Sequence, residues 1–335
     1  MLWRLSMRTS DSYREIMHSP YSEHLIGFIE QRKALGFKYE NQIWMLLHFD
    51  DFVSRYPCID GNELQENLVV KWVEDPMITT GQKRKRSILL RQFGEYMQQI
   101  DKVAYLYPKR KFKAPARYLP YIFTHSQISA ILEYADKDAK EHSSVSSRVD
   151  TAIILRLLYG CGLRISEALS LKMQDVDLDN GVLHIWDSKF QKDRMIPMSQ
   201  TLTSVCIAYS KNCNSGKLPY AYFFSPNGNR RYSAQTIYNR FRDVLFICGI
   251  PHRGKGKGPR LHDLRHTFAV HSLQQLAENG EDLYTVLPIL SEYMGHSSVS
   301  ATQYYLRLTA EVFPDIMEMV EEKFGDVYPE VVCDE

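Results

Sequence analysis

Two arginines and a histidine in the second half of the chain are of types that can bind a phosphate diester. His262 and Arg265 lie three residues apart in the segment HDLRH, so on a helix both side chains project to one face. Arg164 lies earlier, directly after Gly162-Leu163. A lone arginine of this kind is more often a helix cap or a surface charge. Two guanidiniums, however, offer planar forks that match phosphate oxygens and stay charged at any working pH, so together they can neutralise a phosphate without a metal ion.

The elements that position these residues are predicted to be mainly helices with a small β-hairpin, an α+β arrangement. The pattern Thr124-His125-Ser126-Gln127 is a capping box, in which a hydroxyl and an amide satisfy the first free backbone amides of a helix. Segments 181–185 and 194–198 alternate as short strands, so 187–193 forms the tip of the hairpin. Apolar periodicity predicts helices over 126–136, 149–160, 233–248, 261–278 and 301–308, with an interrupted helix between the last two.

The front of the chain reads as a small all-helical unit. Two helices are predicted within 21–55, separated at Gly36, and two more over 62–72 and 83–99. Prolines within a basic stretch disfavour regular structure and indicate an extended linker; they are Pro108, Pro115 and Pro120. We therefore expect a helical domain over 1–113, a linker over 114–120, a second domain over 121–310 and an acidic tail over 311–335.

The bulk composition is that of a globular, cytosolic protein. A chain of 335 residues exceeds the size of one ordinary core, which suggests two domains. No window approaches the roughly 20 uninterrupted apolar residues that a membrane span needs, and charges interrupt the start MLWRLSMRTSDSYREIM where a signal peptide would be apolar. The six cysteines are dispersed without a CxxC pair, which argues against a disulfide framework and against a zinc site.

The net charge of +1 hides a lopsided distribution. Basic residues cluster near the expected linker and in a glycine-rich loop, whereas residues 311–335 are acidic. A basic run on its own is usually a solvated helix face. Because the clusters flank an expected domain boundary, they favour phosphate binding, with an affinity for DNA that depends strongly on salt. The candidate DNA-binding residues are Lys83, Arg84, Lys85, Arg86, Lys109, Arg110, Lys111, Arg253, Lys255 and Lys257.

Three segments carry a resemblance to a known family. They are LYGCGLRISEALSL, HDLRH and GHSSVSATQYY, and they occur in the order that the family has. At these segments the chain resembles the tyrosine recombinase (phage-integrase) family. The likeness covers about residues 150–310. The front domain matches only in size, helicity and position, which implies a DNA-binding domain of the core-binding, SAM-like type.

The resemblance singles out one of the 21 tyrosines as a nucleophile. In the family this tyrosine follows the histidine of the GH segment by nine residues, which leads from His296 to Tyr305. Tyr304 is the rival, but neighbouring residues on a helix point about 100° apart. A free tyrosine is ionised only about one part in a thousand at neutral pH, so the nucleophile needs cations and a base around it. His296 itself would donate a hydrogen bond to the scissile phosphate.

The other catalytic roles follow from the same resemblance. Arg164 and Arg265 become the two catalytic arginines, and His262 accepts or shares the proton of the nucleophile. Lys189, at the hairpin tip, becomes the general acid that protonates the departing 5′ oxygen, and Lys192 is its rival if the hairpin register shifts. The nearby histidines interpreted as structural are His266 and His271.

The resemblance also implies a mechanism and partners. The tyrosine attacks a phosphodiester of double-stranded DNA, giving a 3′-phosphotyrosyl intermediate and a free 5′-hydroxyl. No metal and no cofactor is expected, because the covalent link stores the bond energy and the sequence has no GxxxxGK[ST] loop. The implied assembly is a homotetramer on two recombination sites that passes through a Holliday junction, with an accessory DNA-binding factor as a further candidate partner. We expect a nucleoid-associated protein with no membrane partner, whose segment 312–324 docks on a neighbouring protomer or packs on its own domain.

Other functions stay open at this point. A type IB topoisomerase uses a related tyrosine site, although the compact front domain and the GHSS segment favour a recombinase. A DNA-binding regulator with an inactive site is the second alternative. Among recombinases, an integrase or transposase of a mobile element is preferred to a housekeeping enzyme. One departure from compact family members is a longer stretch between Arg265 and His296, which predicts a longer helix and a lengthened loop around Pro288.

Overall fold

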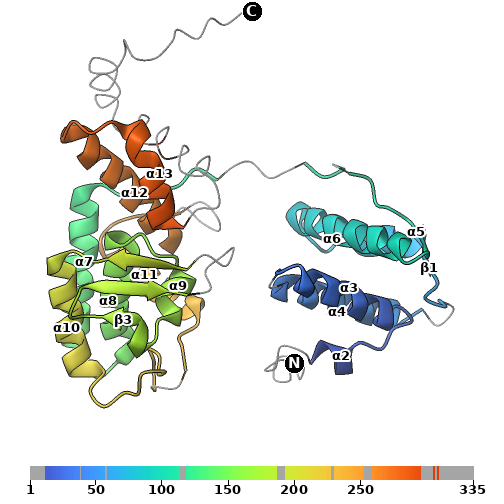
Figure 1. The fold of residues 1–335 in the computed structure, drawn as a ribbon, viewed down its shortest axis with the longest axis horizontal. Helices are drawn as coiled ribbons and strands as arrows, with labels where there is room; N and C mark the ends of the chain where they lie inside the picture. The colour runs from blue at the N-terminus through green and yellow to red at the C-terminus, as the bar shows by residue number, and fades with distance from the viewer. Residues whose placement is uncertain are drawn as a thin grey trace, which may run out of the picture. The chain divides into compact units, whose positions relative to one another are not determined.

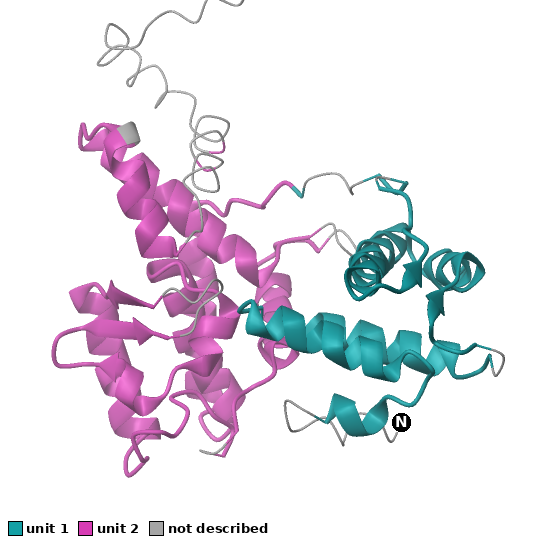
Figure 2. Ribbon diagram, turned by 45° about the vertical axis from the view of Figure 1, so that its right-hand side comes forward, with its two compact units in different colours: residues 1–118 teal, residues 119–335 magenta. Residues whose placement is uncertain are grey.

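The chain forms two compact units, residues 1–118 and 119–335, which Figure 2 colours separately. The computed structural model describes residues 12–37, 39–56, 59–109, 111–113, 118–186, 193–227, 230–252, 258–295, 305 and 308. Helices make up most of these residues and two small sheets the rest of the regular structure (Figure 1), so the expected α+β fold class is confirmed. No described helix is long and apolar enough to cross a membrane.

The first unit packs its helices around an aromatic core. Tyr21, Phe28, Phe49 and Phe93 are fully buried, and their rings contact one another. The capping box formed by Thr79 and Gln82 starts the longest of these helices. The helices are α2 (Tyr13–Ile16), α3 (Ser22–Ala34), α4 (Glu40–Val53), α5 (Glu66–Val73) and α6 (Thr80–Gln99).

The prediction of an all-helical front unit is wrong in one respect. Strand β1 (Glu63–Leu64) pairs in parallel with β2 (Val103–Ala104), so the helix expected from residue 62 begins only at Glu66. Leu64 is fully buried, and its carbonyl accepts a hydrogen bond from the Tyr105 amide at 2.9 Å. The partner strand lies far along the chain, and its contribution is therefore not visible in local periodicity.

The second unit surrounds one central buried helix. Helix α8 (Ser146–Gly160) contacts α7 (His125–Glu141), α10 (Gln200–Cys213), α11 (Ala234–Ile247) and α12 (Leu261–Glu278). Ile154, Leu155 and Leu157 of α8 are fully buried. The remaining helices are α9 (Ile165–Ser170), the short 3-10 helix η1 (Met173–Asp175) and α13 (Leu283–Met294), which lies beside α12 (Figure 1).

Two sequence predictions in this unit are confirmed. The Gln127 amide donates to Thr124 Oγ1 at 3.2 Å and the Thr124 amide to Gln127 Oε1 at 3.1 Å, which completes the capping box that starts α7. Strands β3 (Val176–Asp177), β4 (Val182–Ile185) and β5 (Arg194–Pro197) form an antiparallel sheet in that order. The last pair of the β4–β5 register is Ile185 with Arg194. The hairpin tip, with Lys189, lies outside the described residues.

The loop expected around Pro288 is wrong, because Pro288 lies inside helix α13. A proline there removes one backbone hydrogen bond of the helix. The helix forms nevertheless because Leu283, Leu287, Leu290 and Met294 bury one side of it against α12 and against Tyr305 and Leu308, residues of the same apolar cluster. Tertiary packing thus outweighs the local cost of the proline.

Candidate active site

Arg265 is the most deeply buried charged side chain of the site. It lies in the first turns of α12 and is 1% exposed. Its Nη1 donates to the Gly162 carbonyl and its Nη2 to the Met294 carbonyl at 2.6 Å. Burial, and secondly the charge of Arg164, lower the pKa of Arg265 to about 10, so the guanidinium stays charged at neutral pH.

Arg164 caps the following helix and points to the same place. Its backbone amide donates to Glu167 Oε2 at 2.9 Å and its Nη1 to Glu167 Oε1 at 2.6 Å, so Glu167 closes the first turn of α9. Its Nη2 donates to the Gly295 carbonyl at 2.9 Å. The two arginines that the resemblance selected therefore meet at consecutive carbonyls, those of Met294 and Gly295.

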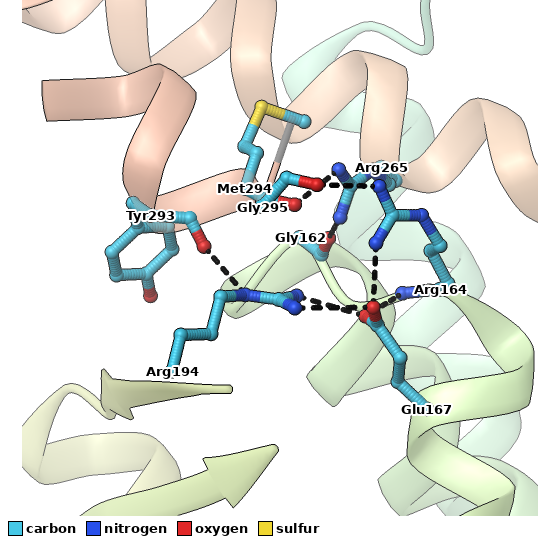
Figure 3. Close-up of polar contacts among 8 residues, drawn as sticks. All are labelled: Gly162, Arg164, Glu167, Arg194, Arg265, Tyr293, Met294 and Gly295. Atoms are coloured by element: carbon cyan, nitrogen blue, oxygen red, sulfur yellow. Dashed lines mark hydrogen bonds and ion pairs between the residues drawn. The ribbon is translucent and has the colours of Figure 1, made fainter. Parts of the chain in front are cut away.

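The sequence presents Arg194 only as one more charge of the hairpin, but the structure brings it into the same cluster (Figure 3). Its Nη1 and Nη2 lie 3.1 and 2.9 Å from the two oxygens of Glu167. Burial alone would raise the pKa of Glu167, but the hydrogen bonds and charge of Arg194, together with Arg164, lower it below its usual range. Glu167 is thus a buried carboxylate that stays ionised between two guanidiniums.

The C-terminal end of α13 receives all three arginines. Arg194 Nε donates to the Tyr293 carbonyl at 3.0 Å, and the next two carbonyls are those bound by Arg265 and Arg164. The last carbonyls of a helix lack partners within the helix and carry its negative dipole end, so cations are favourable there. Gly295 follows with φ +64°, which leads the chain into the segment of His296. His296 lies outside the described residues.

Tyr305 is buried, and its hydroxyl lies against the face of α12 that carries His262 and His266. Only 3% of the residue is exposed, and Tyr305 Oη is 2.9 Å from His266 Nδ1. The sequence predicts a structural role for His266, but the structure places its ring against the hydroxyl of the expected nucleophile. The ring of His262 stands edge-on to that of His266, with centroids 4.7 Å apart. His271 lies further along α12, where it stacks on His125 and contacts the Tyr159 hydroxyl.

His262 is held in its neutral form. Its side chain is exposed by surface area, yet the ring lies close enough to surrounding protein that desolvation, and then the charges of Arg265 and Arg164, lower its pKa to about 4. The two neighbouring guanidiniums favour the neutral form, because a second positive charge close to them is unfavourable. At neutral pH His262 is therefore an uncharged imidazole, which can accept a hydrogen bond at one ring nitrogen.

Comparison with known proteins decides the family. Residues 122–311, more than half of the chain, match the phage integrase family. The chain belongs to the phage integrase family, the tyrosine recombinases. A Sinorhizobium fredii protein named as an integrase/recombinase, y4rB, is 30% identical over 315 residues, covering 92% of this chain and 99% of that protein. The tyrosine recombinase XerA of Pyrococcus furiosus is 30% identical over 203 residues, or 60% of this chain and 62% of its own length.

Solved structures of other recombinases have a similar fold. The integrase of transposon Tn1549, in complex with a circular intermediate DNA, superposes with a TM-score of 0.59 and 18% identity over 84% of this chain and 94% of that one. The XerH recombinase bound to its difH substrate gives a TM-score of 0.57 and 18% identity over 82% and 78% of the two chains. The resemblance stated from the sequence is confirmed. As a tyrosine recombinase, the protein is an enzyme that breaks and rejoins DNA strands.

The described candidate DNA-binding residues of the recombinase contact the rest of the first unit, line grooves on it, or do both. Some hold the first unit together: Arg86 lies over the Trp72 ring at 4.2 Å, and Lys111 pairs with Glu74 at 2.5 Å. Lys83 Nζ donates to the Glu74 carbonyl at 3.1 Å. Grooves along α6 are lined in part by Arg84, Lys85 and Lys109, and Arg86 and Lys111 line them as well. The candidates outside the described residues are Arg110, Arg253, Lys255 and Lys257.

Proposed function

We propose that this protein is a site-specific DNA recombinase of a mobile element, an integrase or transposase that uses Tyr305 as its nucleophile. The observation that carries the proposal is the convergence of Arg164 and Arg265 at the end of α13. The Tyr305 hydroxyl lies against the helix that carries Arg265, next to His266 of the same helix. A phosphate entering between these groups would meet two charged forks and a phenol.

In the first step the Tyr305 oxygen attacks phosphorus, and the bond from phosphorus to the 5′ oxygen breaks. The products are a 3′-phosphotyrosyl bond and a free 5′-hydroxyl. Arg164 and Arg265 stabilise the charge that develops on the non-bridging oxygens. Lys189 supplies the proton to the leaving 5′ oxygen, and His296 donates a hydrogen bond to the phosphate. In the second step a 5′-hydroxyl from another strand reverses the reaction, so one phosphodiester is exchanged for another without net hydrolysis.

The proton of Tyr305 leaves through the histidines of α12. His266 Nδ1 holds the hydroxyl at 2.9 Å, and His262 is neutral at pH 7 because its pKa is about 4. Proton transfer by a positioned side chain contributes about 10²- to 10⁴-fold to a rate. The nearby positive charges favour the phenolate that forms, since an opposite charge lowers the cost of ionisation.

The biological role is proposed from the relatives. The protein named as an integrase/recombinase in Sinorhizobium fredii aligns along nearly its whole length, and a transposon integrase is among the similar structures. Both support a mobile element. The structures of the Tn1549 integrase and of XerH each contain DNA, which supports double-stranded DNA as the substrate of this protein. Exchange of strands between two sites calls for four protomers and a Holliday junction, and an accessory DNA-binding factor would set the direction.

Covalent capture tests the proposal. Protein is recovered under denaturing conditions from cells that express the wild-type chain, Tyr305→Phe or Tyr304→Phe, and any attached DNA is sequenced. Wild type and Tyr304→Phe are expected to carry DNA that ends at a discrete junction, whereas Tyr305→Phe carries none. DNA on Tyr305→Phe would reject Tyr305 as the nucleophile. Scattered ends with relaxation of supercoiled plasmid would favour a topoisomerase, and DNA on none of the chains would favour an inactive DNA-binding regulator.

A further inference from the structure

Arg194 is the first residue of β5, and its side chain is almost fully buried. Only 5% of this side chain is exposed, and only 6% of Glu167, with which it forms a two-pronged ion pair. Its third donor, Nε, reaches the Tyr293 carbonyl at 3.0 Å. Figure 3 shows the guanidinium between the carboxylate and the end of α13. One side chain thus joins three segments that lie far apart in the sequence, β5, α9 and α13.

Stability alone does not account for this buried pair. Removing two charges from water costs about as much free energy as their attraction returns, and well-packed apolar residues are often at least as stable. A hairpin arginine exposed to solvent would avoid that cost. What the pair provides is a defined geometry, because the two parallel hydrogen bonds between a guanidinium and a carboxylate allow one relative orientation.

The geometry matters because Glu167 also holds Arg164. The Arg164 amide and its Nη1 both donate to the same carboxylate, at 2.9 and 2.6 Å. If Arg194 were absent, the full negative charge of Glu167 would face Arg164 alone. With Arg194 present, two positive charges share one negative charge, and the cluster keeps a net positive charge. Arg194 thus helps to hold Arg164 in position. It also leaves Arg164 with enough positive charge to attract an anion.

Arg194 also packs against the turn that Arg164 binds. A Cβ atom at Gly295 would lie 2.8 Å from Arg194 Nη1, so any other residue there would force the guanidinium or the turn to shift. The carbonyl of the same glycine accepts from Arg164 Nη2 at 2.9 Å. Any shift of Arg194 therefore moves both partners of Arg164, the carboxylate and the turn.

We infer that Arg194 is a positioning residue for strand cleavage. By clamping Glu167 and the end of α13, it orients Arg164 toward the scissile phosphate and prevents Glu167 from neutralising that arginine. The inference rests on the proposed function. Arg194 is not expected to contact DNA itself; it acts through Arg164.

The test uses the full chain and duplexes that carry the DNA site recovered by covalent capture. One duplex has an ordinary phosphate at the cleaved position. The other has a methylphosphonate, in which a methyl group replaces one non-bridging oxygen and removes the negative charge. Charge stabilisation by Arg164 is needed for the first duplex and much less for the second. The rate of covalent complex formation in a single turnover, and the protein concentration that gives half of the maximal rate, are measured for each duplex.

Four variants separate a positioning role from a structural one. Arg194→Gln removes the charge and the fork, and Arg194→Lys keeps the charge but not the fork. Arg164→Lys shows the effect of changing the arginine that acts directly. Arg156→Gln is the matched control, because Arg156 belongs to the same unit and forms a partly buried ion pair with Asp136, 17% exposed on the arginine side, outside the cluster. Every rate is divided by the wild-type rate on the same duplex.

On the phosphate duplex Arg194→Gln is expected to slow cleavage about 10- to 100-fold, the same order as the loss caused by removing an outer-shell partner that orients a metal ligand. Arg194→Lys should fall between Arg194→Gln and wild type. The half-saturating concentration should not change. On the methylphosphonate duplex both variants should cleave at close to the wild-type rate, and the same is expected of Arg164→Lys.

Equal losses on the two duplexes, or the same pattern in Arg156→Gln, would show that Arg194 merely supports the fold and would overturn the inference. A wild-type rate for Arg194→Gln on the phosphate duplex would overturn it as well. These results leave the proposed function intact, whereas a wild-type chain that forms no covalent complex with the phosphate duplex would reject the proposed function and the inference together.

Discussion

Replacing Arg265 by lysine should damage both the stability and the activity of the recombinase, by amounts that the structure allows us to estimate. The two carbonyls that Arg265 binds, those of Gly162 and Met294, come from different segments. An ammonium is a compact charge without the planar fork, so it can serve one of these carbonyls but not both. A buried acceptor left without a donor costs about 1–3 kcal/mol.

This loss is small beside the total stability of a folded domain, which is about 5–15 kcal/mol, so the variant should fold. For a domain of this size each kcal/mol lowers the melting temperature by about 2–4 °C, which predicts a decrease of about 2–12 °C. Cleavage should slow by about 10²- to 10³-fold, the effect of removing one preorganised donor from a developing charge. Thermal denaturation and single-turnover formation of the covalent complex measure the two effects separately.

Arg156→Lys is the matched control for this prediction. Arg156 also donates to a backbone carbonyl, that of Ala152, and it lies in the same unit but outside the site. It should lower the melting temperature without slowing cleavage at 25 °C. If Arg265→Lys melts and cleaves like wild type, the reasoning from the two carbonyls is refuted. If it melts lower but cleaves normally, Arg265 is a structural arginine and the proposed phosphate contact is wrong.

Three further predictions follow from the same region. Gly295→Ala should destabilise the chain more than Gly216→Ala. Both glycines have positive φ, at +64° and +76°, but only a Cβ at Gly295 would lie 2.8 Å from a guanidinium. The melting temperatures of the two variants test this, and equal decreases would contradict the close approach. The pKa of His262 is about 4 in the folded chain and near 6.5 in the unfolded chain, so the unfolded chain binds the proton more tightly. The stability that neutral His262 contributes is therefore lost as the pH falls from about 6.5 toward 4. Urea denaturation at several pH values should show a shallower acid loss in His262→Gln than in wild type, and identical slopes would reject the shift. His266→Phe should slow covalent attack by Tyr305 by about 10²-fold or more at neutral pH, because the hydroxyl loses its partner at 2.9 Å; a rate like that of wild type would make His266 a packing residue.

Local signals in the sequence predicted the elements that depend on near neighbours. The capping box at Thr124 and Gln127 starts a helix as expected, since all of its hydrogen bonds lie within four residues. His262 and Arg265 share a helix for the same reason. The β-hairpin also follows from alternation in two nearby segments. Predictions failed where a distant segment supplies the partner: β1 needs β2, and the helix through Pro288 needs the apolar side of α12.

The sequence by itself determined the residue types of the site, its family and the helix that carries His262 and Arg265. Only the tertiary structure decided that Arg194 and Glu167 belong to the site and that His266 faces the Tyr305 hydroxyl. The physical reason is that a buried charge must find its partner wherever the fold brings one. The partners of these arginines are the carbonyls at the end of α13, the Gly162 carbonyl and one shared carboxylate. Apart from the contact between Arg164 and Glu167, which lie three residues apart, these contacts form only when α9, β5, α12 and α13 have packed together.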